Sequence, residues 1–298
     1  MQTVFIHTNA KQMLGAIVAR HSLRRQSADP SAFDVRIIAA EDDPMFREYE
    51  GKRFLRFGMW RAWRNDDLQS FTPLRFAPPK LMGYAGRAIV TDPDVFAIGD
   101  IGELFARDMQ GCAICARPHV DQQGEVRRIA TSVMLLDCAK LRHWDMHAQF
   151  EAMFAGELDY GDWIELKREA DGAIGELEPW WNDFDHLASE TRLLHNTKRR
   201  TQPWKTGLPI DFTNRSPWYM RILGISGYHK KGAYRPHPDP RQEQLFFAFL
   251  KECMDAGEVD RDMIAAEIAQ DHIRHDALEL TARAPQVDAV LGEVRAAA

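Results

Sequence analysis

The sequence predicts one α/β domain with a helical appendage near the C-terminal end, and three observations lead to that prediction. Residues 4–6 and 35–40 are short apolar runs, which are typical of buried strands. Between them, apolar residues recur at helical spacing over 12–23, before Asp29-Pro30 breaks the pattern. Strong helical spacing returns over 242–254 and 260–280. A strand, a helix and a strand in so short a segment imply a parallel strand pair, with ligands expected beyond the carboxyl ends of its strands.

The composition limits the classes of protein that fit. The chain has 298 residues, of which 45% are hydrophobic and 28% charged, as in a folded protein rather than a disordered or collagen-like one. With 38 basic and 44 acidic side chains the formal net charge is −6, which argues against a nucleic-acid partner. No apolar run could span a bilayer, and residues 1–6 do not begin a secretory signal. We therefore expect a cytoplasmic protein with no transmembrane segment.

The cysteines suggest two interpretations. Four cysteines are too few for a disulfide scaffold in a chain of this length. Cys112 and Cys115 form a Cys-x-x-Cys pair, which fits a redox or zinc site. The small apolar neighbours of the pair favour the second interpretation, a buried strand.

Further elements are predicted along the middle of the chain. Strands are expected over 88–90, 112–116 and 132–136, and a helix over 139–154. A helix from Leu74 towards Met82 must bend or stop at Pro78-Pro79. Residues 53–64 alternate arginine with aromatic side chains, which fits either a stacking surface for a nucleotide or sugar or an amphipathic surface element.

The strand over 88–90 runs directly into Asp92-Pro93-Asp94. Because proline ends ladder pairing, both carboxylates are expected on a turn at the end of the strand. Two carboxylates one residue apart can reach the same divalent cation, since Mg²⁺ and Mn²⁺ prefer oxygen ligands. Asp-Pro-Asp is also an ordinary turn sequence, in which the side chains cap backbone N–H groups. The motif alone therefore leaves both interpretations open.

The order of segments around this turn resembles a known family. Arg75 is followed by Asp92-Pro93-Asp94, by Asp100-Ile101-Gly102-Glu103-Leu104, by a strand over 131–137, and by Leu193-Leu194-His195 with Pro203-Trp204 after it. This order resembles the family 8 retaining glycosyltransferases, which include glycogenin and bacterial lipopolysaccharide galactosyltransferases. The resemblance covers roughly residues 1–205.

The resemblance implies a fold and an activity. The fold would be the nucleotide-diphospho-sugar transferase (GT-A) fold, a mixed, mainly parallel sheet flanked by helices. Residues 1–205 would form the nucleotide-sugar-binding and catalytic domain, with 206–298 packed on it as a loop and helical extension. The chain would transfer a sugar from a nucleotide-sugar donor, usually UDP-linked, to a glycan or other acceptor with retention of configuration.

The resemblance also assigns residues to roles. Asp92, Asp94 and His195 would hold Mn²⁺ or Mg²⁺, and Asp162 would act at the reaction centre. A basic cluster at 198–200 would provide positive charge for the diphosphate of the donor. The residues expected to contact the donor are Thr8, Asn9, Arg75, Thr131, Ser132, Lys198 and Lys205.

Four positions depart from the family pattern. Thr8 begins an altered segment after the first strand, Ala77 replaces an expected lysine, Lys198 replaces a glycine, and Gln202 replaces a phosphate-binding lysine. These departures leave two alternatives: a non-catalytic nucleotide-sugar or glycan-binding protein with a degenerate site, and a nucleotidyltransferase, which also uses paired aspartates and a divalent ion. The sequence does not specify the acceptor, because variable loops build acceptor pockets.

Overall fold

The computed structural model describes residues 2–67, 69–120, 123, 125–215, 227–229 and 232–296. A six-stranded sheet in the order β2-β1-β5-β8-β7-β9 forms its centre. The strands are β1 (Gln2–Thr8), β2 (Phe33–Ala39), β5 (Arg87–Thr91), β7 (Ile114–Val120), β8 (Val126–Asp137) and β9 (Ile174–Glu176). β1 is parallel to β2 and β5, and β7 is parallel to β9, whereas β8 is antiparallel to both of its neighbours. The predicted mixed, mainly parallel sheet is confirmed.

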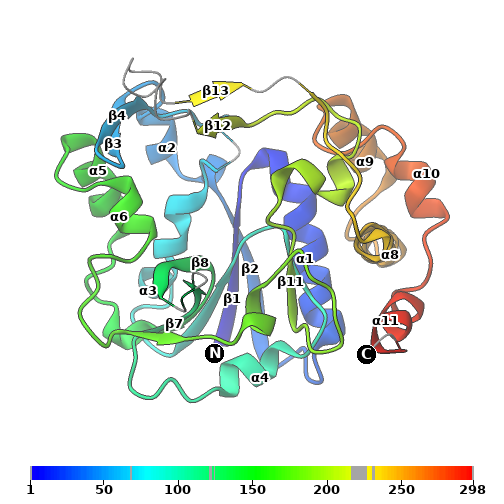
Figure 1. Ribbon diagram of the computed structural model, residues 1–298, viewed down its shortest axis with the longest axis horizontal. Coiled ribbons are helices and arrows are strands. Elements are labelled where there is room, and N and C mark those ends of the chain that lie inside the picture. The colour runs from blue at the N-terminus through cyan, green and yellow to red at the C-terminus, as the bar shows by residue number, and fades with distance from the viewer. Residues whose placement is uncertain are drawn as a thin grey trace.

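The sheet has an apolar core on each face because successive side chains of a strand point to opposite sides. In β1, Val4 and Ile6 belong to one core and Phe5 to the other. Figure 1 shows α1 and the C-terminal helices on one side of the sheet, and α3, α5 and α6 on the other. These helices are α1 (Met13–Gln26), α3 (Pro78–Leu81), α5 (Met146–Ala155) and α6 (Tyr160–Ile164), with α2 (Pro44–Glu48) and α4 (Ile101–Ala106) as shorter connections. Burial on both faces explains why the centre of β1 is an unbroken apolar run, at residues 4–6, rather than an alternating one.

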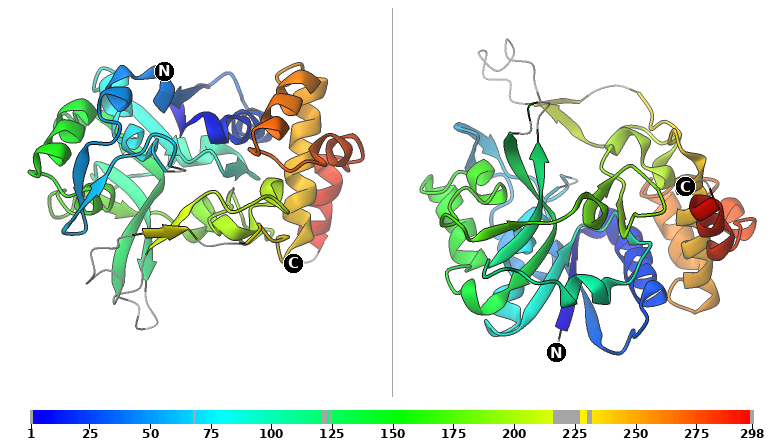
Figure 2. Two further views of the ribbon diagram at one scale, coloured as in Figure 1. Left: turned by 90° about the horizontal axis from the view of Figure 1, so that it is seen from above. Right: turned by 60° about the horizontal axis from the view of Figure 1, so that its bottom comes forward.

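The C-terminal helices complete one of the two cores. They are α8 (Pro240–Asp255), α9 (Arg261–Ala269), α10 (Ala277–Ala282) and α11 (Val287–Ala296), which lie together along one side of the molecule (Figure 2). α8 contacts α1, and Phe246 and Phe249 share a core with Val4. The predicted helical appendage is therefore confirmed, whereas a domain boundary at residue 205 stays a prediction. None of the described helices is long and apolar enough to cross a membrane.

Three regions show how local chemistry set the bounds of elements. The predicted helix over 139–154 is wrong at its start, since α5 begins at Met146. Asp145 is its N-cap, and the Asp145 carboxylate accepts from the backbone N–H of Ala148. The predicted helix over 260–280 is two helices, separated by a segment in which Asp271 has a φ of 56°. The aromatic and basic segment 53–64 forms a hairpin of β3 (Arg53–Arg56) and β4 (Met59–Ala62), as an amphipathic surface element would.

A second, smaller sheet brings distant segments to the end of β5. Its order is β10 (Asp183–Phe184), β11 (Leu193–His195) and β6 (Val95–Ala97). β6 follows the Asp92-Pro93-Asp94 turn directly and pairs antiparallel with β11, so that His195 lies opposite Val95. This pairing places residue 195 beside residue 94. A separate hairpin of β12 (Thr213–Arg215) and β13 (Gly227–His229) crosses the top of the molecule in Figure 1.

Candidate metal and donor site

Asp92, Asp94 and His195 form one cluster at the end of β5. One ligand atom from each side chain lies within 4.8 Å of the other two. Nε2 of His195 is 3.2 Å from Oδ1 of Asp94, and both side chains are nearly buried. The structure therefore brings together the three residues that the family resemblance assigned to a cation.

The hydrogen bonds of Asn182 fix the orientation of His195. Nδ2 of Asn182 donates to Oγ of Ser132 at 2.9 Å, which leaves its Oδ1 facing Nδ1 of His195 at 2.8 Å. Because an amide oxygen only accepts, Nδ1 of His195 carries a proton. In neutral His195 the lone pair is therefore on Nε2, the atom that faces Asp94. Metal-binding histidines in proteins are commonly held in this way.

The space between His195 and Asp94 suits a positive charge. Oδ1 of Asp94 is buried and has no hydrogen-bond donor among the described residues. It faces the lone pair of Nε2, and two lone pairs repel unless a proton or a cation lies between them. Burial lowers the pKa of His195, but the carboxylates of Asp94 and Asp92 outweigh it and hold that pKa above its ordinary value. The residues present thus fit a divalent cation.

Asp92 is held by two side chains on its other side. Nη2 of Arg75 lies 2.6 Å from each carboxylate oxygen, and Nε2 of His7 lies 2.7 Å from Oδ1. Burial raises the pKa of Asp92, but Arg75 and His7 outweigh it and keep that pKa well below its usual range. Asp92 is therefore ionised. Among the described residues its Oδ2 accepts only from Arg75, which leaves a lone pair for a further ligand.

The loop that carries His195 is anchored at several points. The backbone N–H of Asn196 donates to the carbonyl of Asp94 at 3.1 Å, and its side chain donates to Gln242 of α8. The carboxylate of Asp185 accepts from Oγ1 of Thr197 at 2.5 Å and from the backbone N–H of Lys198 at 3.2 Å. These bonds connect β11 both to the Asp92-Pro93-Asp94 turn and to the C-terminal helices.

A pocket of about 170 Å³ opens over the cluster. Its lining consists of Gln12, Gln69, Phe71, Asp92, Asp94, His195, Thr197, Arg199 and Gln202. Nε2 of Gln202 donates to Oδ2 of Asp94 at 3.1 Å. Gln202 therefore orients a proposed metal ligand, at the position where the sequence resemblance led us to expect a phosphate-binding lysine. Among the described residues that line this pocket, Arg199 is the basic one.

Five of the residues predicted to contact the donor lie behind the cluster and do not line the pocket. Thr8 and Asn9 are buried, and Nδ2 of Asn9 donates to the carbonyl of Asp67 and to Oγ of Ser70. Thr131 accepts from Nη1 of Arg75 at 2.8 Å, and Ser132 accepts from Asn182. Arg75 itself points to Asp92 rather than into the pocket.

The other three predicted residues lie further out or are already paired. Lys198 is exposed. Lys205 is fully buried, its Nζ is 2.5 Å from Oδ2 of Asp211, and burial lowers its pKa. Asp162 lies on α6 and is half exposed, and its Oδ1 is 3.2 Å from Nζ of Lys167. None of the three lines the pocket described above.

Several residues of the site were not predicted from the sequence. Of these, His7 has the clearest sequence signal, because it is an imidazole near the carboxyl end of a buried strand. The sequence gives no local signal for Asn182, Gln12, Gln69 and Phe71, since they lie in loops and short 3-10 helices whose positions depend on the whole fold.

Comparisons with known proteins give a likeness to solved glycosyltransferases over part of the chain. No family model matches the sequence, and no curated protein matches it.

The glycosyltransferase GlyE of Streptococcus pneumoniae TIGR4 is 15% identical, with a TM-score of 0.48 over 68% of this chain. The match spans 55% of the GlyE chain, little more than half of its length. The galactosyltransferase LgtC, solved with donor and acceptor sugar analogues, is 14% identical over 68% of this chain and 89% of its own, with a TM-score of 0.48. Mouse xyloside xylosyltransferase 1 is 15% identical over 66% of this chain and 98% of its own, with a TM-score of 0.43. This chain is therefore similar in part to glycosyltransferases, at TM-scores below 0.5.

Proposed function

We propose that this chain is a glycosyltransferase that uses a nucleotide-sugar donor and a divalent cation held by Asp92, Asp94 and His195. One observation carries the proposal. Oδ1 of Asp94 has no hydrogen-bond donor among the described residues and lies 3.2 Å from Nε2 of His195, with Asp92 beside both. Two carboxylates and one imidazole suit Mn²⁺ better than Mg²⁺, which favours oxygen ligands alone. The order of motifs in the sequence supports the same function.

Some residues of the site would bind the cation and the donor, and others orient those ligands. When bound, the cation would supply Lewis-acid stabilisation of the departing nucleoside diphosphate. Asn182 accepts from Nδ1 of His195, so that the lone pair of the neutral ring is on Nε2, and Gln202 orients Asp94. Arg199 brings a permanent positive charge to the wall of the pocket, where it can bind a phosphate oxygen.

We extend the proposal to a UDP-linked donor, a glycan acceptor and retention of configuration because of the sequence resemblance. A role for Asp162 at the reaction centre has the same basis. In the present arrangement α6 is connected to the cluster through Thr131, whose Oγ1 donates to the carbonyl of Ile164 at 2.9 Å. A bound donor that reaches Asp162 would have to extend beyond the pocket over the cluster.

One observation favours the alternative of a binding protein without turnover. Lys205 is buried against Asp211, and Gln202 is a neutral side chain that donates to Asp94, so neither offers a cation to a diphosphate. Strong stabilisation of a departing diphosphate usually needs several such groups. A protein with this site could bind a nucleotide sugar through the cation and still transfer nothing.

The experiment is a panel of nucleotide sugars with Mn²⁺, followed by product analysis for the native chain, Asp94→Asn and Asp255→Asn. Asp255 is an exposed partner of Lys251 on α8 that does not line the pocket over the cluster, and it serves as the matched control. Release of nucleoside diphosphate that is lost only in Asp94→Asn supports the proposal. Metal-dependent binding without product supports the binding protein, and pyrophosphate release supports a nucleotidyltransferase. Equal turnover in all three proteins contradicts a role for the cation.

A further inference from the structure

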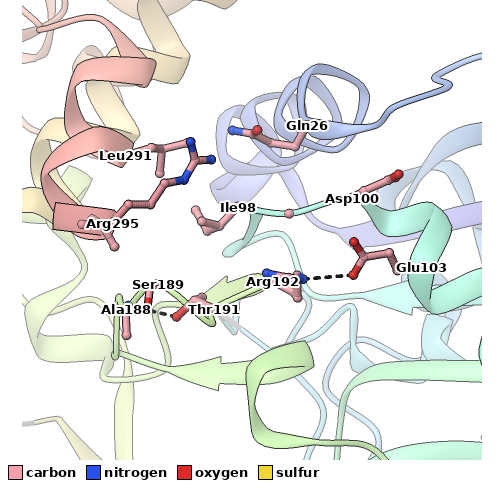
Figure 3. A pocket seen from close by; sticks show the side chains of 12 residues that line it. Gln26, Ile98, Asp100, Glu103, Ala188, Ser189, Thr191, Arg192, Leu291 and Arg295 are labelled. Atoms are coloured by element: carbon pink, nitrogen blue, oxygen red, sulfur yellow. Dashed lines mark hydrogen bonds and ion pairs between the residues drawn. The ribbon is translucent and has the colours of Figure 1, made fainter. Parts of the chain in front are cut away.

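A second pocket, of about 270 Å³, lies between the last turn of α1, the start of α4, the segment before β11, and α11. Figure 3 shows it from close by. Its lining consists of Gln26, Ile98, Gly99, Asp100, Glu103, Ala188, Ser189, Thr191, Arg192, Leu291, Val294 and Arg295. No aromatic side chain is among them. A sugar ring usually stacks on an aromatic face, so the lining does not favour a carbohydrate ligand.

The two acidic side chains of this pocket already have partners. Oδ1 of Asp100 accepts from the backbone N–H of Gly102 at 2.8 Å and from Oγ of Ser27 at 3.1 Å. Oε2 of Glu103 accepts from Nε of Arg192 at 3.0 Å. The charge of Arg192 is therefore balanced by Glu103. Asp100 is the N-cap of α4 and keeps its negative charge, because both of its donors are neutral, so that Arg295 is the cation that offsets it in the lining.

Two hydrogen-bond donors of the pocket have no partner. The amide nitrogen Nε2 of Gln26 is buried and makes no hydrogen bond with the described residues. Arg295 is exposed, and within the part of the chain that the structure describes it forms neither an ion pair nor a hydrogen bond. In Figure 3 both side chains extend into the gap between α1 and α11. An unpaired buried donor costs free energy, and a guanidinium is a strong donor to carboxylates and phosphates.

We propose that this pocket binds a small anion through Gln26 and Arg295, with a phosphate group as its best ligand. The volume exceeds that of the phosphate group alone, so the rest of the ligand would lie over Ser189 and Thr191. The proposal is independent of the glycosyltransferase proposal, because it shares no residue with the metal cluster.

The pocket and the metal cluster lie at opposite ends of the same two strands. Ile98 and Gly99 follow β6, and both backbone N–H groups donate to the carbonyl of Arg192, which precedes β11. At the other end of these strands His195 pairs with Val95, next to Asp94. Packing is tight at the pocket end, since a Cβ added to Gly99 would lie 2.3 Å from Cδ of Arg192. An anion here would therefore contact the segments that position Asp94 and His195.

The test adds inorganic phosphate, glucose 6-phosphate and glucose separately to the full chain. Calorimetry and backbone amide NMR measure the binding of each. We expect both phosphates to bind and glucose not to bind, with the largest shifts at the amides of Ile98, Gly99 and Arg192. Stronger binding of the sugar phosphate would identify a phosphorylated metabolite as the ligand, and equal binding would identify free phosphate. Both results support the site.

Variants locate the binding. Arg295→Gln and Gln26→Ala should each weaken phosphate binding roughly tenfold or more, since each removes an unpaired donor. Arg24→Gln is the matched control, because Arg24 is an exposed arginine on the same helix as Gln26 and does not line the pocket. The proposal is overturned if phosphate does not bind, if glucose binds equally well, or if the control loses as much affinity as the two variants.

Discussion

Nη2 of Arg75 lies 2.6 Å from both carboxylate oxygens of Asp92, so a fixed positive charge occupies one side of a proposed metal ligand. Arg75 balances one of the two carboxylate charges of the cluster and leaves one net negative charge when His195 is neutral. A divalent cation at Asp92 and Asp94 therefore binds close to a like charge. Coulomb repulsion at such distances amounts to a few kcal/mol even in a partly polar environment.

Arg75→Met should therefore tighten Mn²⁺ binding, by roughly tenfold (~1.4 kcal/mol). The variant also loses its bonds to Asp92 and Thr131, so its melting temperature without metal should fall. Calorimetric Mn²⁺ titration and thermal melts with and without Mn²⁺ measure both effects. Arg64→Met, at an exposed arginine, is the control. A smaller stabilisation by Mn²⁺ in Arg75→Met than in the native chain would show that Arg75 does not compete with the cation.

The three residues predicted to hold a cation lie together, whereas those predicted to contact a donor do not line the pocket, and the reason is physical. Asp92 and Asp94 are placed by a strand and a proline, both of which are visible locally. The fold class followed in the same way from apolar runs and helical spacing. Lysine is a common phosphate ligand, but tertiary packing buries Lys205 against Asp211. Arg75 likewise pairs with a carboxylate inside the protein, and no local sequence pattern shows that this carboxylate is Asp92.

Asn182 should control the affinity of the cluster for metal without touching the metal itself. Asn182→Ala leaves Nδ1 of His195 without its acceptor, so the ring loses its fixed tautomer and orientation. Changes to such supporting residues typically weaken metal binding about 10–100-fold. Ser132→Ala removes only the group that orients Asn182 and should have a smaller effect. Mn²⁺ titrations of both variants test this order, and equal or reversed effects would contradict the assigned orientation of His195.

His119 should titrate far below an ordinary histidine. Its ring is stacked on Phe184 at 4.8 Å, and burial, with the added charges of Arg128 and Arg117, lowers its pKa to about 4. Between pH 6.5 and about 4 the unfolded chain binds a proton at this residue that the folded chain does not. The contribution of His119 to stability is therefore fully present above pH 6.5 and falls as the pH drops towards 4.

NMR titration of the histidine rings measures this pKa directly. Chemical denaturation at several pH values should then show a smaller loss of stability on acidification in His119→Asn than in the native chain. The histidine rings of the urea-unfolded chain provide the comparison for an unperturbed titration. A His119 resonance that titrates with the same midpoint in the folded and the unfolded chain would show that the ring is not shielded as the structure indicates.

Gly15 should be required for the position of the Asp92-Pro93-Asp94 turn. A Cβ at residue 15 would lie 2.9 Å from the backbone carbonyl oxygen of Pro93, which cannot move without moving both aspartates. Gly15→Ala should therefore destabilise the protein by about 1–3 kcal/mol and weaken Mn²⁺ binding in the same variant.

Gly292→Ala is the matched control, because Gly292 also lies in a helix and a Cβ there would meet no atom within 4 Å. It should stabilise the protein by up to ~1 kcal/mol, since alanine favours helix more than glycine does, and leave Mn²⁺ binding unchanged. Denaturant unfolding and Mn²⁺ titration of both variants separate a general helix effect from displacement of the turn. If Gly15→Ala binds Mn²⁺ as tightly as the native chain, the contact between α1 and Pro93 does not position the metal ligands.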